Sequence, residues 1–433
     1  MQNELTENVG ESQKQNQIVS VKKRGVVKAT WLIMLCWLVY TCSYIGKLSY
    51  SANISQIEEL FSLRHGESGT VSTFFFFAYG AGQIINGLLC KKYPLRYVIF
   101  GALLVSSATN LAIPFITVDT FFLIKFLWLL NGLALSVLWP SLIRLLSETL
   151  DKKDLNRAVV VMGTTVATGT FLVYAMSALF TALKVFKITF FVAATLIPTI
   201  ATIWMFAYPK LVEKTQKEEE IPLVDGVKRE KRPLAAGLIV FLAFAAFCAV
   251  ANNLVKDGLT TWTPEILDEV YGLPNWTSIL LTMLLPLLAI FGTVVVTAIH
   301  KKIKDFHAIN GILFGASGAL IGVVLGFLST DLVPVTVAAF AIVSCLMAGV
   351  NNVITSMIPL YMKEKVGNSG MLAGILNGFC YLGSTISSYG LGMVADHFGW
   401  KAVFILFLVL CGAATLLGFG YAIVHACIQK KNK

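Results

Sequence analysis

A polar stretch, 209-PKLVEKTQKEEEIPLVDGVKREKRP-233, interrupts a chain of 433 residues that is otherwise rich in apolar side chains. Lysine, glutamate and arginine dominate this stretch and a proline stands at each end, so it cannot bury a core and is expected to lie in water. It divides the chain into two hydrophobic parts of similar length. We therefore predict a linker between two domains at 209–233.

The sequence on either side of the linker is typical of a membrane protein. Hydrophobic residues make up 56% of the chain and charged residues 13%, and the mean hydropathy is +0.75. Crossing a bilayer takes about 20 consecutive apolar residues. Such spans occur six times before the linker and six times after it, at 29–54, 68–90, 96–116, 119–146, 157–180, 188–208, 234–262, 276–300, 307–328, 332–362, 369–395 and 400–426. We predict an all-α polytopic membrane protein with twelve transmembrane helices in two six-helix pseudo-repeats.

This reading predicts five segments with distinct surroundings. They are a disordered cytoplasmic tail at 1–28, an N-terminal half at 29–208, the cytoplasmic linker at 209–233, a C-terminal half at 234–426 and a short cytoplasmic tail at 427–433. The first of them starts without an apolar run, so no cleavable signal peptide is predicted, and the first span is expected to direct insertion itself.

Basic residues are distributed very unequally between the two sides of the predicted membrane. Of the 34 lysines and arginines, 27 fall on the side of the two tails and the linker, and four fall on the other side: Arg64, Lys184, Lys187 and Lys401. Loops rich in lysine and arginine stay in the cytoplasm. We therefore predict a cell (inner) membrane protein with both termini cytoplasmic.

Several functional classes find no support in the composition. Topogenesis explains the net charge of +10, and no basic domain suggests a nucleic-acid partner. The eight cysteines lie in spans or at their edges without a CxxC pair, and the five histidines lie at span ends or in loops, which indicates neither a zinc site nor a mid-membrane proton relay. Phosphate-binding loops and hydrolase motifs are missing, so we expect no metal, no other cofactor and no enzyme activity.

Two lysines stand deep within apolar spans, Lys47 in the first and Lys256 in the seventh, at comparable depth in the two halves. A lysine in mid-helix costs about 2.5–3.5 kcal/mol on insertion scales, so it faces the bundle interior, a counter-ion or water. Lys47 lies too deep to snorkel at about 1.5 Å per residue, and the alternative for Lys256 is a structural ion pair with Asp257. The two lysines predict a shared central substrate site.

Two motifs in the C-terminal half are more specific. The first is 256-KDGLTTWTPEILDE-269, and the second combines 374-GILNGFCYLG-383 with 396-DHFGW-400 at the exit of the same span. Together with Tyr79-Gly80, Trp139-Pro140 and Arg144 in the N-terminal half, they make the chain resemble the organophosphate:phosphate antiporter family of the major facilitator superfamily, over about residues 29–420. The resemblance implies the major facilitator fold, rocker-switch alternating access and a cavity lined by spans 1, 2, 4, 5, 7, 8, 10 and 11.

The sequence departs from that family at its anion-binding positions. Members that carry phosphate esters have an arginine directly before a lysine in span 1 and a second arginine in span 7, whereas this chain has Gly46-Lys47 and Lys256. The family's basic or histidine positions in spans 2 and 5 correspond to Gln83 and Val166. A guanidinium pairs with phosphate through two hydrogen bonds, but an ammonium acts as a point charge. We therefore expect a monoanionic or polar organic solute.

Other polar groups within the spans complete the candidate site. Besides the two lysines, the substrate-binding candidates are Tyr79, Gln83, Asn351, Asn352 and Tyr381, and hydrogen bonding between helices is the alternative for each. Asn351 and Asn352 cannot both face the site, because adjacent residues are about 100° apart on a helix. Asp257 is the candidate for proton coupling, with a fixed counter-ion or a solvated residue as alternatives. The run at 74–77, four phenylalanines, is expected to pack against lipid and neighbouring helices.

These observations predict a secondary active transporter of a small polar, anionic organic solute. Its expected partners are the small-molecule substrate, the lipid bilayer and either a co-transported proton or a counter-transported anion, and we expect it to act as a monomer. Two alternatives stay open. One is an organophosphate/phosphate antiporter, and the other is a transport-incompetent membrane sensor on the same fold.

Overall fold

The computed structural model describes residues 29–89, 94–212, 236–328, 330, 332–362 and 369–431. Within these ranges all regular elements are helical, which confirms the all-α prediction. A bilayer offers no water to unpaired backbone groups, so apolar spans of this length satisfy their own amides as helices. The predicted N-terminal tail, most of the predicted linker and the last residues of the predicted C-terminal tail lie outside the described residues.

The helices follow one another with short connections. Before the linker they are a first helix at Ala29–Leu48, then α2 (Ile54–Phe61), α3 (His65–Leu89), α4 (Leu95–Ala112), α5 (Phe122–Leu135), α6 (Leu138–Thr149), α7 (Lys152–Gly163), α8 (Thr165–Ala182) and α9 (Ile188–Leu211). After it they are α10 (Ala236–Tyr271), α11 (Asn275–Thr282), α12 (Leu284–Ala289), α13 (Gly292–Lys302), α14 (Phe306–Phe327), α15 (Val333–Asn352), the π-helical turn η5 (Val353–Met357), α16 (Ile358–Tyr361) and α18 (Ser369–Lys431).

Ten segments of the described chain are long and apolar enough to cross a membrane. One of them, Leu372–Ile423, has 52 residues and contains Gly399, whose φ of 74° and ψ of 170° divide α18 into two helices. The helix α3 has 25 residues but falls outside the ten, since Gln83 and Asn86 make it more polar. Counting α18 as two membrane-spanning helices and adding α3, the described chain has the twelve transmembrane helices that the sequence predicts.

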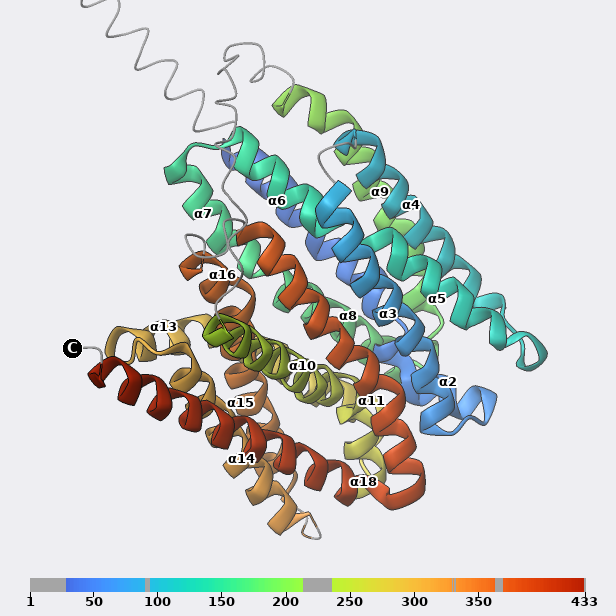
Figure 1. Ribbon diagram of the computed structural model, residues 1–433. Coiled ribbons are helices and arrows are strands. Elements are labelled where there is room, and N and C mark those ends of the chain that lie inside the picture. Colours follow the sequence, from blue (N-terminus) through green and yellow to red (C-terminus); the bar gives the residue numbers. More distant parts are fainter. Residues whose placement is uncertain are drawn as a thin grey trace, which may run out of the picture.

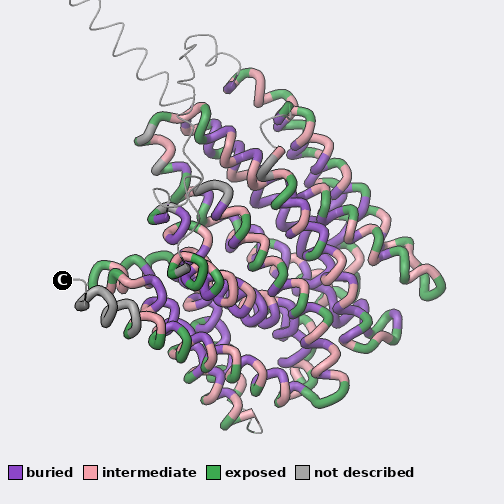
Figure 2. Tube along the Cα trace, viewed as in Figure 1, coloured by how far each residue is buried: buried purple, intermediate pink, exposed green. Residues whose placement is uncertain are grey.

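The helices gather in two groups that follow the order of the chain. In Figure 1 the blue-to-green helices lie together, the yellow-to-red helices lie together, and the first part of α18 runs beside α3 where the groups meet. Buried residues line the inner sides of the helices, and exposed residues lie mainly on the outer sides and at the ends (Figure 2). This arrangement agrees with the predicted halves, whose exact boundaries stay a prediction.

Glycines let the helices approach closely at two important crossings. A Cβ on Gly69 of α3 would lie 2.2 Å from the carbonyl oxygen of Ser388 on α18, and a Cβ on Gly383 of α18 would lie 2.2 Å from the carbonyl oxygen of Val250 on α10. Backbone atoms cannot retreat as a side chain can, so both crossings need glycine. The first crossing joins the two groups of helices, and the second lies within one group.

The two groups are also joined by polar contacts at one end of the bundle, which we call the His65 face. Nε2 of His65 lies 2.9 Å from Oε1 of Glu269 on α10. The carboxylate of Asp396 on α18 accepts hydrogen bonds from the backbone amides of His65 (3.0 Å) and Gly66 (2.7 Å), the first residues of α3. A carboxylate at this position satisfies the free amides of the helix and complements its dipole. The opposite end, where the first helix begins, is the terminus face.

Candidate functional site

Lys47 lies at the end of the first helix inside a cage of aromatic rings. Its side chain is 6% exposed. Its Nζ lies 4.3–5.8 Å from the centroids of five rings contributed by the first helix, α3 and α18: those of Tyr44, Phe75, Phe76, Tyr79 and Tyr381. The faces of aromatic rings attract a cation within about 6 Å. We call this group the Lys47 cage.

The cage corrects the expectation for the phenylalanine run. Phe77 is 62% exposed, and the ring of Phe74 packs on Phe126, as expected for residues that meet lipid and neighbouring helices. Phe75 and Phe76 are buried and face Lys47 instead. Four consecutive residues point in different directions around a helix. Two phenylalanines of the run therefore face lipid and a neighbouring helix, and the other two face Lys47.

Tyrosines connect the cage across three helices. The ring of Tyr79 stacks on Phe75 at 5.6 Å and lies 4.7 Å from the ring of Tyr381, and its hydroxyl is 3.3 Å from that of Tyr40. The sequence reasoning selected Tyr79 and Tyr381 but missed Tyr40 and Tyr44. The spacing of the sequence could have indicated them, because positions 40, 44 and 47 have the i, i+4, i+7 spacing of one helix face.

Lys256 and Asp257 form the second part of the site, on α10. Nζ of Lys256 lies 3.3 Å from Oδ1 of Asp257, and the two side chains are 23% and 18% exposed. Oδ2 of Asp257 accepts hydrogen bonds from Nδ2 of Asn253 (3.2 Å) and from the hydroxyl of Ser384 on α18. These bonds hold the carboxylate within the C-terminal group of helices and direct it toward Lys256.

Helix α18 links the two parts of the site, because the ring of Tyr381 lies 5.2 Å from Nζ of Lys47 and Ser384, three residues later, donates a hydrogen bond to Asp257. The two lysines come from different groups of helices, and Asp257 is the ion-pair partner of Lys256. With all three groups ionised, the site carries one net positive charge. In a surrounding of low dielectric constant this charge favours binding of an anion.

Gln83 and Asn351 face α18, whereas Asn352 faces α13. Oε1 of Gln83 accepts a hydrogen bond of 2.7 Å from Nδ2 of Asn377, which links α3 to α18, and Oδ1 of Asn351 lies 3.7 Å from Sγ of Cys380 on α18. Nδ2 of Asn352 donates to the hydroxyl of Thr293 on α13 at 2.9 Å. The structure therefore directs Asn351 toward α18 and Asn352 away from it, as the angle between adjacent residues requires.

Gly46, next to Lys47, faces α4 and α9 and not the cage. A Cβ there would lie 2.5 Å from Cδ1 of Ile197 and 2.6 Å from Oγ of Ser106, and its carbonyl oxygen accepts bonds from Nδ2 of Asn110 (3.1 Å) and Asn131 (3.0 Å). A larger side chain at this position must displace the side chains of Ile197 and Ser106. The position of the missing span 1 arginine therefore faces α4 and α9 in this structure, and not the cage.

Gly46→Leu is expected to lower the melting temperature of the purified protein by several degrees, because overpacking a filled interior costs about 1–3 kcal/mol. Gly101→Leu is the matched control, since a Cβ on Gly101 meets no atom within 4 Å. The comparison is made by thermal unfolding in detergent. Equal melting temperatures for the two variants would contradict the packing of Gly46.

Comparison with known proteins places this architecture in a family. The model of the Major Facilitator Superfamily matches residues 36–386. The glycerol-3-phosphate transporter of Bacillus subtilis (strain 168) is 24% identical over 370 residues, covering 80% of this chain and 81% of that protein, and the sugar phosphate exchanger 3 of Mus musculus is 22% identical over 394 residues, covering 80% and 78%. The crystal structure of a D-xylose-proton symporter superposes with a TM-score of 0.70 at 10% identity, covering 90% of this chain and 97% of that one.

Proposed function

Because the chain belongs to the major facilitator superfamily, we propose that it carries a small organic monoanion across the cell membrane by alternating access, with Lys47 and Lys256 holding the anion. The protein is a membrane transporter and not an enzyme. The substrate class and the roles of individual residues are what the proposal adds. The single observation that carries it is the pair of lysines from different groups of helices, linked through Tyr381 and Ser384 of α18, with Asp257 paired to Lys256.

The charge balance of the site supports a monoanion. A carboxylate or sulfonate would neutralise the one net positive charge of Lys47, Lys256 and Asp257. A dianionic phosphate ester would leave an excess negative charge beside buried aromatic rings, where uncompensated charge is costly. The Lys47 cage supplies flat ring faces for the carbon skeleton of the solute, and Gln83, Asn351, Tyr79 and Tyr381 supply polar groups around it.

A second candidate substrate class is that of the relatives. The proteins of Bacillus subtilis and Mus musculus are named for glycerol 3-phosphate and sugar phosphate. Two lysines that reach one solute could hold a phosphate ester if Asp257 turned away or took up a proton. We therefore keep phosphate ester/phosphate exchange as the alternative to test.

The proposal includes an orientation and a cycle. We propose that the terminus face is cytoplasmic, because 27 of the 34 basic residues belong to that side. The halves at 29–208 and 234–426 would rock about the central site, as a monomer, coupled to a proton or to a counter-transported anion. Asp257 is the candidate for coupling, and its ion pair with Lys256 supports the counter-ion role equally well.

Ligand-dependent stabilisation tests the substrate class. A ligand that binds only the folded state raises the melting temperature. Sugar acids, sulfonates and other monoanions are expected to stabilise the purified protein more than glycerol 3-phosphate or sugar phosphates do. Stabilisation by phosphate esters alone would overturn the monoanion proposal. Flux of the stabilising ligand in proteoliposomes then tests whether that ligand is the transported solute.

Lys256→Gln is expected to weaken binding of the monoanion about 10- to 150-fold, because a hydrogen bond to a charged group is worth about 1.5–3 kcal/mol. The affinity for a neutral analogue of the same ligand should fall little. Binding is measured by the dependence of the melting temperature on ligand concentration. Equal losses for the anion and its neutral analogue would mean that Lys256 supports only the structure.

A further inference from the structure

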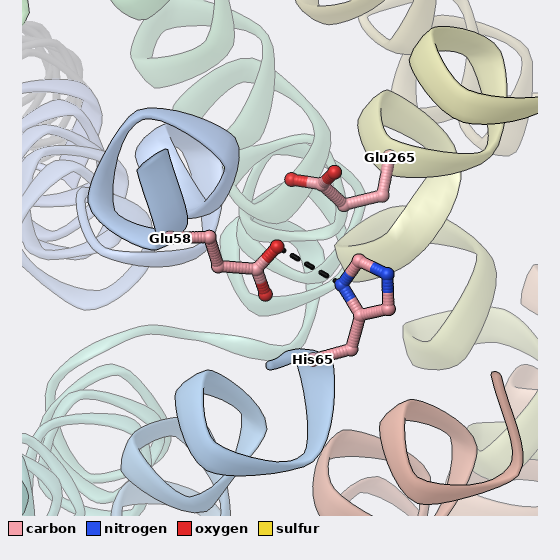
Figure 3. Close-up of side chains that lie close together, drawn as sticks. All are labelled: Glu58, His65 and Glu265. Atoms are coloured by element: carbon pink, nitrogen blue, oxygen red, sulfur yellow. Dashed lines mark hydrogen bonds and ion pairs between the residues drawn. The ribbon is translucent and has the colours of Figure 1, made fainter. Parts of the chain in front are cut away.

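His65 occupies an unusual position between the two groups of helices. Its Nδ1 lies 2.9 Å from Oε2 of Glu58 on α2, and its Nε2 lies 2.9 Å from Oε1 of Glu269 on α10. Figure 3 shows the bond between Glu58 and His65. Trp262 and Trp400 flank the imidazole, with ring centroids at 5.6 and 5.3 Å. The ring is therefore fixed between two carboxylates that belong to different groups of helices.

This geometry requires a proton. A neutral imidazole carries one N–H, and an ionised carboxylate can only accept hydrogen bonds, so a histidine that bonds to a carboxylate at each nitrogen is an imidazolium. The bond to Glu269 crosses between the groups of helices and exists only while the His65 face is closed. The bond to Glu58 stays within one group.

Glu265 provides a second, independent indication of a bound proton. It is 4% exposed, and its Oε1 makes no hydrogen bond with the described residues. Figure 3 shows its carboxylate directed toward Glu58 and His65, and one ligand atom from each of the three residues lies within 4.8 Å of the others. An ionised Glu265 would be an unpaired buried charge beside the carboxylate of Glu58. A proton on Glu265 removes that charge.

The surroundings of the cluster are strongly acidic. A cavity of about 370 Å³ opens at this point, and six acids face it together with one arginine and one histidine. By element these groups are Glu58 and Glu59 on α2, Arg64 in the connection before α3, His65 on α3, Glu265, Asp268 and Glu269 on α10, and Asp396 on α18. The excess of negative charge makes the cavity attractive to cations.

We propose that Glu58, His65, Glu265 and Glu269 form a proton-binding site that is complete only when the His65 face is closed. The inference rests on the alternating-access cycle proposed above and adds its control by protons. When the halves separate, His65 loses Glu269 and Glu265 meets water. The proton that the closed cluster binds tightly is then released to the side that has opened.

The direction of the pH effect follows from linkage. The closed state binds the proton more tightly than the open state, in which His65 keeps Glu58 but loses Glu269, so its pKa falls toward the ordinary histidine value of about 6.5. The extra stability of the closed state is complete below that pH and is lost as the pH rises. For one proton the ratio of open to closed molecules increases at most tenfold per pH unit. Acidity on the His65 side therefore favours the state that opens to the terminus face.

Distance measurement between the two halves tests the proposal without any substrate. Spin labels are attached through genetically encoded residues at Val118 and Trp276, which are exposed beside the His65 face. The full-length protein is placed in nanodiscs, and double electron–electron resonance gives the fraction of open molecules between pH 6 and 9. We expect this fraction to rise with pH, with a slope close to one proton in the range above pH 6.5.

Three variants make the result decisive. His65→Gln and Glu269→Gln should flatten the pH dependence, and Glu59→Gln is the matched control, since it alters an acid of the same cavity outside the four-residue cluster. A flat profile in the unmodified protein would overturn the proposal, and so would an unchanged slope in both of the first two variants. If Zn²⁺ at constant pH closes the face and Glu265→Gln removes that effect, the cluster is a metal site and the proton proposal is overturned.

Failure of this inference can be distinguished from failure of the proposed function. A wrong substrate class shows itself as missing ligand stabilisation and missing flux, while the pH-dependent distance persists. A wrong proton site leaves ligand binding and flux intact and removes only the pH dependence of the distance.

Discussion

Lys47→Gln is expected to abolish saturable uptake of the monoanionic substrate in proteoliposomes, while the melting temperature of the empty protein stays the same or rises. Lys47 is the buried positive charge inside the ring cage. Its loss leaves Lys256 and Asp257 to neutralise each other. Removing one charge-assisted bond costs about 1.5–3 kcal/mol, and removing the net charge adds to that loss. Affinity is expected to fall at least 100-fold, roughly.

Lys125→Gln is the matched control for this variant. Lys125 also lies in an apolar helix, but it stands near the start of α5 and makes no part of the Lys47 cage. Its replacement should leave uptake within about twofold, because it is expected to reach the interface. Normal uptake by Lys47→Gln would show that the cage serves the structure and not the substrate.

Gly69→Val is expected to abolish transport without unfolding the protein. Its Cβ would collide with the backbone of Ser388 only while the two groups of helices are in contact on the His65 face. The closed state is therefore penalised by about 1–3 kcal/mol or more, whereas the state with this face open is spared. The spin-label distance between Val118 and Trp276 should lengthen at every pH, and the melting temperature should change little.

Two further glycines distinguish this effect from general disruption. Gly383→Val should lower the melting temperature, because its contact with Val250 joins α10 and α18 within one group and is needed in every state. Gly101→Val, at an uncrowded position, should affect neither stability nor transport. If Gly69→Val melts like Gly383→Val, the crossing of α3 and α18 is a permanent contact and the halves do not separate there.

The fold could be predicted because a bilayer leaves few alternatives to a helix. The length of the apolar segments and the polar stretch at 209–233 were sufficient to predict twelve helices in two groups. Sequence hydropathy was least informative for α3, which carries polar groups toward its neighbours, and for α18, where a single glycine conformation turns one long helical segment into two. Both irregularities arise from tertiary contacts and backbone conformation, which average hydropathy does not report.

The candidate site was predictable only in part. The cost of burying an ammonium pointed directly to Lys47 and Lys256, and the structure brings both into one site. Tyr40, Tyr44, Phe75 and Phe76 escaped notice because tyrosine and phenylalanine are ordinary core residues, and their role depends on which helix face meets Lys47. Roles of individual residues stay predictions until ligand binding is measured.

His65 shows why loop positions are hard to interpret from one sequence. It stands at a span end, so the sequence offered no reason to connect it with Glu269, more than 200 residues away. Only the folded chain brings the two together. The resemblance to phosphate-ester carriers was similarly incomplete at Gly46, which the structure packs against the side chains of Ile197 and Ser106.

Asp396 holds the other group of helices through the backbone amides of His65 and Gly66 and not through their side chains. Side-chain mutagenesis on α3 therefore leaves these two hydrogen bonds in place, since every residue except proline presents the same backbone N–H group. A scan of α3 would detect the imidazole of His65 and the crossing at Gly69, but not the two backbone bonds to Asp396. The side chain that makes this contact belongs to residue 396 alone, so only a substitution there removes it.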